Sequence, residues 1–127
     1  AETKTVLIND GGAPARILNF TAAEAISAGE LCSIDSNGKA ALSANNNAPM
    51  AGVALVDAAS GDLVSLVTGS GVIIRMICKN NVTKGQLLMI DEAVAGSCLL
   101  YGAGSENVCV GVALEAGDGS LTKCLVF

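Results

Sequence analysis

The fold of this chain is decided by the stretch Ile26-Ser27-Ala28-Gly29-Glu30-Leu31-Cys32-Ser33-Ile34-Asp35. Fifty-six residues later the same pattern returns as Val82-Thr83-Lys84-Gly85-Gln86-Leu87-Leu88-Met89-Ile90-Asp91. Each stretch ends in a short apolar run followed by an aspartate, which is typical of a β-strand that stops at a turn.

A second block supports an internal repeat. Ala51-Gly52-Val53-Ala54-Leu55 returns 59 residues later as Val110-Gly111-Val112-Ala113-Leu114. At the same offset, Leu66-Val67 meets Leu125-Val126. Two blocks that recur in the same order indicate a true repeat rather than chance similarity in a chain rich in small apolar residues. The copies span about residues 17–67 and 73–126.

Both copies are typical of β-structure, because short apolar runs lie between clusters of Gly, Asn, Asp and Ser. The expected strands are Val6–Ile8, Ala15–Phe20, Leu31–Asp35, Ala40–Leu42, Gly52–Val56, Leu63–Thr68, Gly71–Cys78, Leu87–Asp91, Cys98–Tyr101, Val108–Leu114 and Lys123–Phe127. Ser36-Asn37-Gly38 predicts a hairpin with a type I′ turn, and Ala22–Ile26 could form one helical turn. We therefore expect an all-β fold, a small barrel or sandwich built from two similar β units with an extended N-terminal arm.

The repeat also divides the chain. Residues 1–16 lie outside both copies and form the predicted arm, and residues 17–127 form a single β domain made of the two repeats. Val6-Leu7-Ile8 is too apolar for a frayed end, so we expect the arm to dock on its own domain or on a partner. Its candidate partner-binding residues are Lys4, Val6, Leu7, Ile8 and Arg16.

Composition argues against an enzyme. The 127 residues include no His and no Trp, and aromatic residues make up only 2%. Without His the chain lacks the commonest general base, the commonest metal ligand and the usual partner of a nucleophilic Ser or Cys. We therefore expect no catalytic residues, no cofactor and no metal.

The five cysteines are odd in number, and no pair has metal-site spacing. Their repeat counterparts are Leu88 for Cys32, Ala22 for Cys78, Met50 for Cys109 and Ser65 for Cys124. Because Leu, Ala, Met or Ser stands at the equivalent position of the other copy, we predict that these cysteines fill space in the core.

Charge and hydropathy argue against two classes of partner, nucleic acids and membranes. The net charge is −5, and no basic stripe or set of stacking aromatics suggests nucleic-acid binding. No apolar run approaches the roughly 20 residues that a membrane helix needs. No secretory signal is visible, so we expect synthesis in a cytosol.

Three polar positions invite a functional interpretation. Asp91-Glu92 could form an acid/base pair, but Asp35 stands at the matching place in the first copy, which favours a turn cap. Lys84 could be a carrier lysine, but the first copy has Ala28 there. Arg75 lies in the most apolar stretch of the chain. It is either an outward-facing residue of a half-buried strand or an interface arginine. Ile74, Arg75 and Met76 are the candidate oligomer interface.

The motifs at Ile26–Asp35, Met50–Asp62, Val64–Ile74, Val82–Asp91 and Val110–Gly117, in this order and spacing, resemble the small capsid cement (head-decoration) proteins of tailed bacteriophages. The resemblance implies an all-β homotrimer on the outside of an expanded phage head, bound to the major capsid protein. It also implies that an N-terminal arm helps to clamp neighbouring capsid subunits and that the shell is stabilised against internal DNA pressure.

A second interpretation remains open: a non-catalytic ligand- or carbohydrate-binding β module of a virion spike or adhesin. Such sites usually present Trp or Tyr platforms, and this chain has a single Tyr, Tyr101.

Overall fold

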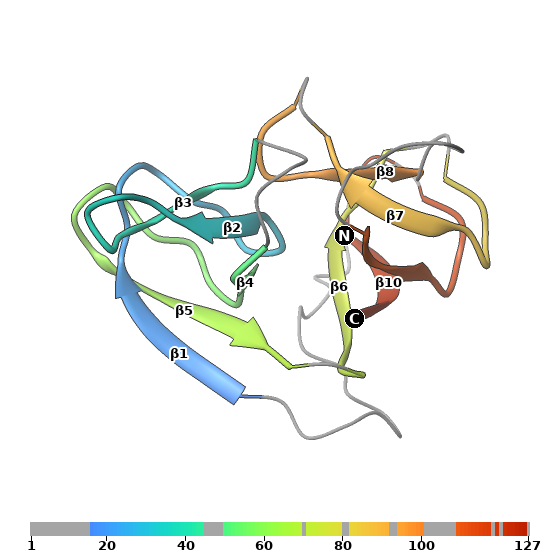
Figure 1. Ribbon diagram of the computed structural model, residues 1–127, viewed down its shortest axis with the longest axis horizontal. Coiled ribbons are helices and arrows are strands. Elements are labelled where there is room, and N and C mark those ends of the chain that lie inside the picture. The colour runs from blue at the N-terminus through green and yellow to red at the C-terminus, as the bar shows by residue number, and fades with distance from the viewer. Residues whose placement is uncertain are drawn as a thin grey trace, which may run out of the picture.

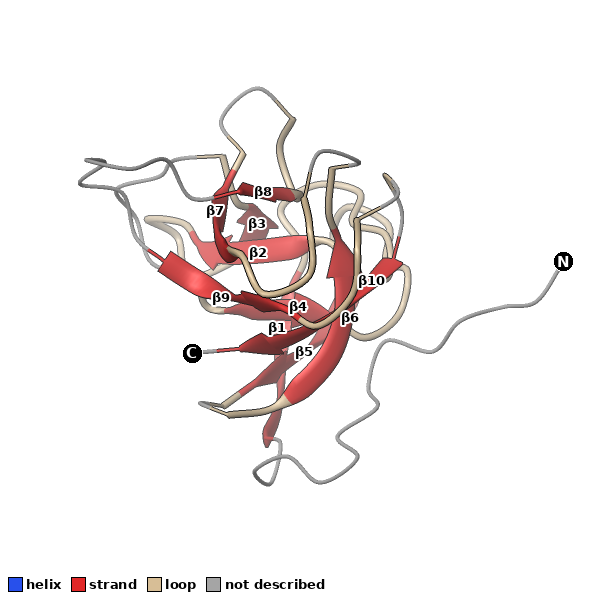
Figure 2. Cartoon of the chain, turned by 90° about the vertical axis from the view of Figure 1, so that its right-hand side faces the viewer, coloured by secondary structure: helices blue, strands red, loops and turns tan. Residues whose placement is uncertain are grey.

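The computed structural model describes residues 16–44, 50–69, 71–79, 82–91, 94–100, 109–117, 119 and 121–126. Within them, ten strands form two antiparallel sheets of five strands each, and no helix occurs. The two sheets lie side by side (Figure 1), and strands make up the regular structure of both (Figure 2). An all-β fold of two similar units is confirmed, whereas the expected strand Val6–Ile8 lies outside the described residues.

The first unit contains β1 (Arg16–Thr21), β2 (Leu31–Ile34), β3 (Ala40–Leu42), β4 (Gly52–Ala54) and β5 (Leu63–Thr68), in the sheet order β1-β5-β4-β2-β3. The second unit contains β6 (Ile73–Ile77), β7 (Leu87–Ile90), β8 (Cys98–Leu100), β9 (Cys109–Ala113) and β10 (Leu121–Val126), in the order β6-β10-β9-β7-β8. The two orders correspond strand for strand, so the sequence repeat is a repeat of topology.

The strand pairing corrects one alignment of the repeat. In the first sheet Val53 pairs with Val67, and in the second its counterpart Val112 pairs with Leu125. The structural counterpart of Val67 is therefore Leu125, and the expected offset of 59 is too long by one residue in the last strand. The correction matters because a slip of one residue moves every side chain of a strand to the other face of the sheet.

With the corrected alignment, the counterpart of Cys124 is Leu66 rather than Ser65. Cys124 and Leu66 are both fully buried, whereas Ser65 is only half-buried. A Leu–Cys exchange at a buried position fits space filling better than the expected Ser–Cys exchange did.

The predicted hairpin between β2 and β3 is present, but its turn is not type I′. Gly38 has φ 77°, and its N–H donates to the carbonyl oxygen of Asp35 at 3.0 Å. Asp35 and Lys39 close a three-residue loop, because the Asp35 N–H donates to the Lys39 carbonyl oxygen at 2.8 Å. The carboxylate of Asp35 holds the loop by accepting the N–H groups of Asn37 and Lys39, both at 2.9 Å. Asp35 is therefore the turn cap that the sequence predicted.

The expected helical turn at Ala22–Ile26 is wrong. Ala22 forms a β-bridge with Ala40, and Ile26 forms one with Ala58. Ile26 and Ala58 exchange two backbone hydrogen bonds of 2.9 and 2.8 Å. The β-bridges at the two ends of this segment, rather than a helical turn, hold the side chains of Ala22 and Ile26 in the core, where they are 1% and 2% exposed.

Two apolar clusters form the core. The smaller one lies within the first unit and contains Ala22, Ile26, Cys32, Ala40, Ala54, Val64 and Leu66. The larger one is built on the second unit, but it also includes three residues of the first sheet, Leu31, Val53 and Val67. These three side chains lie on the sheet face opposite the smaller cluster, so the first unit packs this face against the second.

Backbone hydrogen bonds also join the units. Gly96 of the second unit accepts the N–H of Leu31 and donates its own N–H to the Ser43 carbonyl oxygen, both at 2.8 Å. At the edge of β6, the Ile77 N–H donates to the Gly29 carbonyl oxygen at 2.9 Å. The joint between the units is therefore both apolar and hydrogen-bonded.

Candidate interaction surface

The β6 strand separates the three residues predicted as an oligomer interface. Ile74 and Met76 are 1% and 0% exposed and belong to the larger core cluster. Arg75 lies on the opposite face, half-buried, directly across from Lys123 of β10. Because side chains alternate between the two faces of a strand, three consecutive residues cannot form one surface. Ile74 and Met76 are core residues, and of the three only Arg75 reaches the outer face.

The predicted arm residues Lys4, Val6, Leu7 and Ile8 lie outside the described residues. Arg16, expected both as the last residue of the arm and within the strand Ala15–Phe20, is the first residue of β1. It is exposed and is paired with Thr68 of β5.

The β1 strand is the most exposed strand of the described structure. Its first four residues, Arg16 to Asn19, are exposed on both faces of the sheet. Ile17 and Leu18 are 49% and 46% exposed. Among the described strands β1 pairs only with β5. A sheet edge with exposed apolar side chains is a common docking site for another chain.

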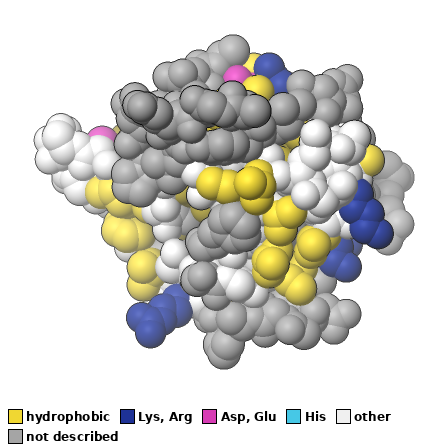
Figure 3. Space-filling view, turned by 45° about the vertical axis from the view of Figure 1, so that its right-hand side comes forward, with side chains coloured by type: hydrophobic (Ala, Val, Ile, Leu, Met, Phe, Trp, Pro, Cys, Tyr) yellow, Lys and Arg dark blue, Asp and Glu magenta, His cyan; other side chains and the backbone are white. Residues whose placement is uncertain are grey.

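Further exposed apolar side chains lie elsewhere. Leu87 on β7 is 46% exposed and Ile34 on β2 is 40% exposed. In the space-filling view, hydrophobic side chains gather in separate patches with Lys and Arg beside them (Figure 3). Scattered exposed apolar residues are normal on a monomer, so their arrangement across the repeat, rather than their number, carries information.

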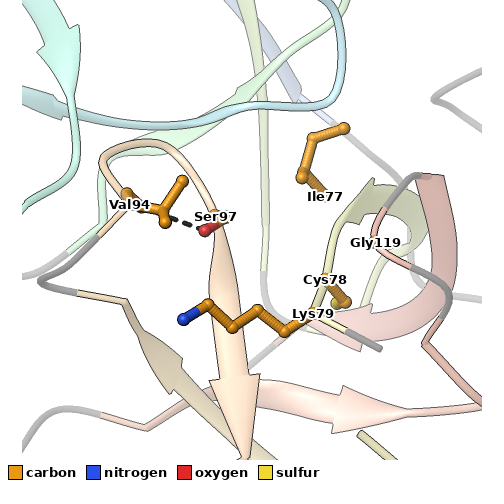
Figure 4. A pocket seen from close by; sticks show the side chains of 6 residues that line it. All are labelled: Ile77, Cys78, Lys79, Val94, Ser97 and Gly119. Atoms are coloured by element: carbon orange, nitrogen blue, oxygen red, sulfur yellow. Dashed lines mark hydrogen bonds between the residues drawn. The ribbon is translucent and has the colours of Figure 1, made fainter. Parts of the chain in front are cut away.

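A small cavity of about 220 Å³ lies beside the joint of the two units (Figure 4). It is lined by Ile77, Cys78, Lys79, Val94, Ser97 and Gly119. The volume is below the range of about 300–1,000 Å³ that is usual for small-molecule sites. The hydroxyl of Ser97 is occupied, since it donates to the Val94 carbonyl oxygen at 2.9 Å.

Asp91, next to this cavity, is an ion-pair residue. Its Oδ2 lies 2.9 Å from Lys79 Nζ and 3.5 Å from Ser97 Oγ, and the residue is 3% exposed. The expected turn cap is confirmed for Asp35. Its counterpart Asp91 begins a longer loop, which closes on Ser97, and its carboxylate also pairs with Lys79.

Three thiols meet in the core of the second unit. Cys78 Sγ and Cys124 Sγ are 3.7 Å apart, and Cys98 is bridged to Cys78 through the backbone. A hydrogen bond with the Cys78 thiol is the larger cause, and burial the second, of the raised pKa values of the Cys98 and Cys124 thiols. Burial raises the pKa of Cys32 from its ordinary 9.0 to about 12. Protonated, buried thiols are poor nucleophiles.

In the described part of the chain, no group of three or more His, Cys, Asp or Glu side chains is arranged so that it could hold a metal ion. The same residues include no helix that is long and apolar enough to cross a membrane.

Among solved structures, the chain is similar to the N base of the head fiber gp8.5 of bacteriophage phi29. The sequence identity is 19% and the TM-score is 0.67, over 90% of this chain and 95% of that one. This likeness concerns the fold. No curated protein matches the sequence.

The comparison with protein families shows membership of a family and not only a shared fold. A family model described as phage cement protein matches residues 12–126, a span that contains all ten strands from Arg16 to Val126. The match therefore covers both units and the joint between them. This chain belongs to the phage cement protein family and is a structural protein associated with a phage capsid.

Proposed function

We propose that the protein binds the outer surface of an expanded phage head as a homotrimer and stabilises the shell against the pressure of packaged DNA. The single observation that carries the proposal is the family match across both β units. The proposed partner is the major capsid protein, and no catalytic step is assigned to the chain.

The stabilisation works by linkage. A ligand that binds only the expanded shell stabilises that state by RT ln(1 + [L]/Kd), which is about 4 kcal/mol per site at a thousandfold excess over Kd. A trimer makes three contacts at once, so its avidity can exceed the affinity of a single contact by about 10²–10⁴. Many weak contacts can therefore hold the expanded shell together against internal pressure without any chemical reaction.

The arm is part of the proposal. Val6, Leu7 and Ile8 precede the residues matched by the family, which begin at residue 12. We assign residues 1–15 to an arm that contacts the shell, with Lys4 as its basic residue, and residues 16–127, which begin with Arg16 of β1, to a single β domain. The shared core cluster and the hydrogen bonds between Gly96 and the first unit support treating both repeats as one domain.

The test is co-sedimentation of the purified protein with expanded and with unexpanded shells of its own phage. Saturable binding to expanded shells alone, in multiples of three copies, is the expected result. Binding to neither shell would remove the proposal and leave a ligand-binding β module as the remaining function.

A variant that lacks residues 1–15 but keeps Arg16 and the whole of β1 tests the arm. We expect it to decorate expanded shells at least tenfold more weakly than the full chain. Unchanged affinity would show that the arm makes no contact with the shell.

A further inference from the structure

At the joint, one face of the first sheet packs on the core of the second unit. The equivalent face of the second unit, and the equivalent surface of the first unit, are not used in this way within the described part of the chain. In the first sheet, Val67, Val53 and Leu31 pair across three strands and are 2%, 0% and 0% exposed. We call these residues the covered row. They belong to the core cluster of the second unit, so the second unit is what covers them.

The second sheet has the same row in the same register. Leu125 pairs with Val112, and Val112 pairs with Leu87. We call these residues the uncovered row. Leu125 and Val112 are half-buried and Leu87 is 46% exposed. No described residue of the chain covers the uncovered row as the second unit covers its counterpart.

The opposite half of the joint is left over on the first unit. Ile74 and Ile90 of the second unit are 1% and 0% exposed, in the cluster that includes the covered row. Their counterparts in the first unit, Leu18 and Ile34, are 46% and 40% exposed. Both side chains lie on the face of the first sheet that carries the smaller core cluster, Leu18 on β1 and Ile34 at the end of β2, and we call this part of that face the open end.

The glycines of the joint repeat this asymmetry. A Cβ on Gly29 would contact Leu121 and Ile77 of the second unit, whereas a Cβ on its counterpart Gly85 would meet nothing within 4 Å. A Cβ on Gly96 would lie 2.8 Å from Glu30 Oε2. A Cβ on its counterpart Gly38 would, like one on Gly85, meet nothing within 4 Å. All four glycines have a positive φ, between 77° and 88°, so the backbone shape is the same and only the neighbour differs.

We propose that a second copy of this chain fills the missing half. The uncovered row of one copy packs on the open end of the next, as the covered row packs on the second unit within one chain. The carbonyl oxygen of Gly85 then takes the place of Gly29 beside the edge of β1, and Gly38 takes the place of Gly96. The inference rests on the proposed trimer and names the surfaces through which its copies meet.

The polar residues of the open end suit such a contact. Its other two positions are Arg16 and Thr68, where the second unit has the buried residues Val72 and Val126. A surface that is also exposed in the free monomer needs polar residues at its rim. The contact joins two different surfaces, so copies add head to tail, and the proposed trimer is the ring in which this addition closes after three copies. Three copies would bring six β units together.

The test uses two variants of the full chain, Leu18→Asp and Leu87→Asp, studied by sedimentation velocity and native mass spectrometry. Each replaces an exposed side chain, so the monomer is expected to fold, as far-UV circular dichroism checks. Each variant alone should lose the trimer, with association at least about 30-fold weaker. The matched control is Val56→Asp: Val56 is 49% exposed in the turn after β4, and its counterpart Glu115 accepts the N–H of Lys123 within the second unit, so this change should leave the trimer intact.

Mixing the two variants gives the decisive result. Leu18→Asp keeps an intact uncovered row and Leu87→Asp keeps an intact open end, so one good contact forms and assembly stops at a heterodimer. No heterodimer in the mixture, or a trimer retained by both variants, would overturn the inference. If both variants remain trimeric, the proposed trimer is retained but its copies meet through other surfaces. A wild-type chain that is monomeric at every concentration overturns trimer and contact together, while shell binding is judged separately by co-sedimentation.

Discussion

Cys32, Cys78, Cys98 and Cys124 are all 0% exposed, and the residues that replace them in the other copy are Leu88, Ala22, Ala40 and Leu66. At the three positions of the second unit's thiol cluster, the first unit has two small residues and one large one. Three side chains of intermediate size thus replace two small and one large, which keeps the packing of a core that tolerates little change in volume.

Because the folded chain keeps its buried thiols protonated, its stability should depend on alkaline pH. The pKa of Cys32 rises from 9.0 to about 12 on folding. Its contribution is fully present below pH 9 and is lost as the pH rises toward 12, since only the unfolded chain ionises in that window. We expect the free energy of unfolding to fall by about 1.4 kcal/mol per pH unit for each such thiol.

Urea titrations at a series of pH values from about 8 to 10.5 measure this slope. The Cys32→Ala variant should show a shallower slope above pH 9, whatever its stability at neutral pH. Equal slopes for variant and wild type would mean that Cys32 ionises in the folded state.

The Lys79–Asp91 ion pair gives a second prediction at this scale. Lys79→Met should lower the free energy of unfolding by about 1–3 kcal/mol, because it removes a partner of a carboxylate that is 3% exposed. The exposed Lys39→Met should change it by less than about 0.5 kcal/mol. Thermal unfolding compares the two variants, and a double-mutant cycle with Asp91→Asn isolates the pair. A coupling energy near zero would show that Asp91 does not depend on Lys79.

At the scale of the strand, β4 and β9 each need a glycine. A Cβ on Gly52 would lie 2.8 Å from the Val67 carbonyl oxygen, and a Cβ on Gly111 would contact that of Leu125. We expect Gly52→Ala to destabilise the protein by about 1–3 kcal/mol, since backbone must shift to make room. The exposed turn variant Ser36→Ala is the control in the same urea titration. A neutral Gly52→Ala would mean that β4 and β5 can separate without loss.

Strand positions could be predicted from the sequence, because apolar runs and turn residues alternate clearly from Arg16 to Val126. The turn after β2 differs from the two-residue turn that Asn37-Gly38 favours, because the carboxylate of Asp35 holds a three-residue loop. The last strand was misaligned by one residue because Leu66-Val67 and Leu125-Val126 match in residue type, although their faces do not.

The candidate surface was harder to predict. The sequence places Ile74 and Met76 in an apolar run on either side of Arg75, but the larger core cluster buries both. Leu18 and Leu87 carry the same kind of side chain as their buried counterparts Ile74 and Leu31. Which of two equivalent residues ends up exposed depends on whether its unit has a neighbour on that side, and a pattern along the sequence does not record this.

At the scale of the whole molecule, the joint couples the two units. Gly96 has φ 84°, and a Cβ there would crowd Glu30 and Leu42 of the first unit. We expect Gly96→Ala to lower the melting temperatures of both units together, giving one calorimetric transition in variant and wild type. Two separate transitions would show that the units unfold independently.

The bonds that Leu31 and Ser43 make to Gly96 also set an order for synthesis. A ribosome delivers the whole first unit well before residue 96, so during that interval the Leu31 N–H and the Ser43 carbonyl have no Gly96 to bond. The first unit therefore cannot complete its hydrogen bonds and its core contacts until the second unit has been synthesised. A truncated messenger that ends after the codon for Thr68 would give a fragment whose covered row is exposed to solvent, and such a fragment would be degraded rather than assembled.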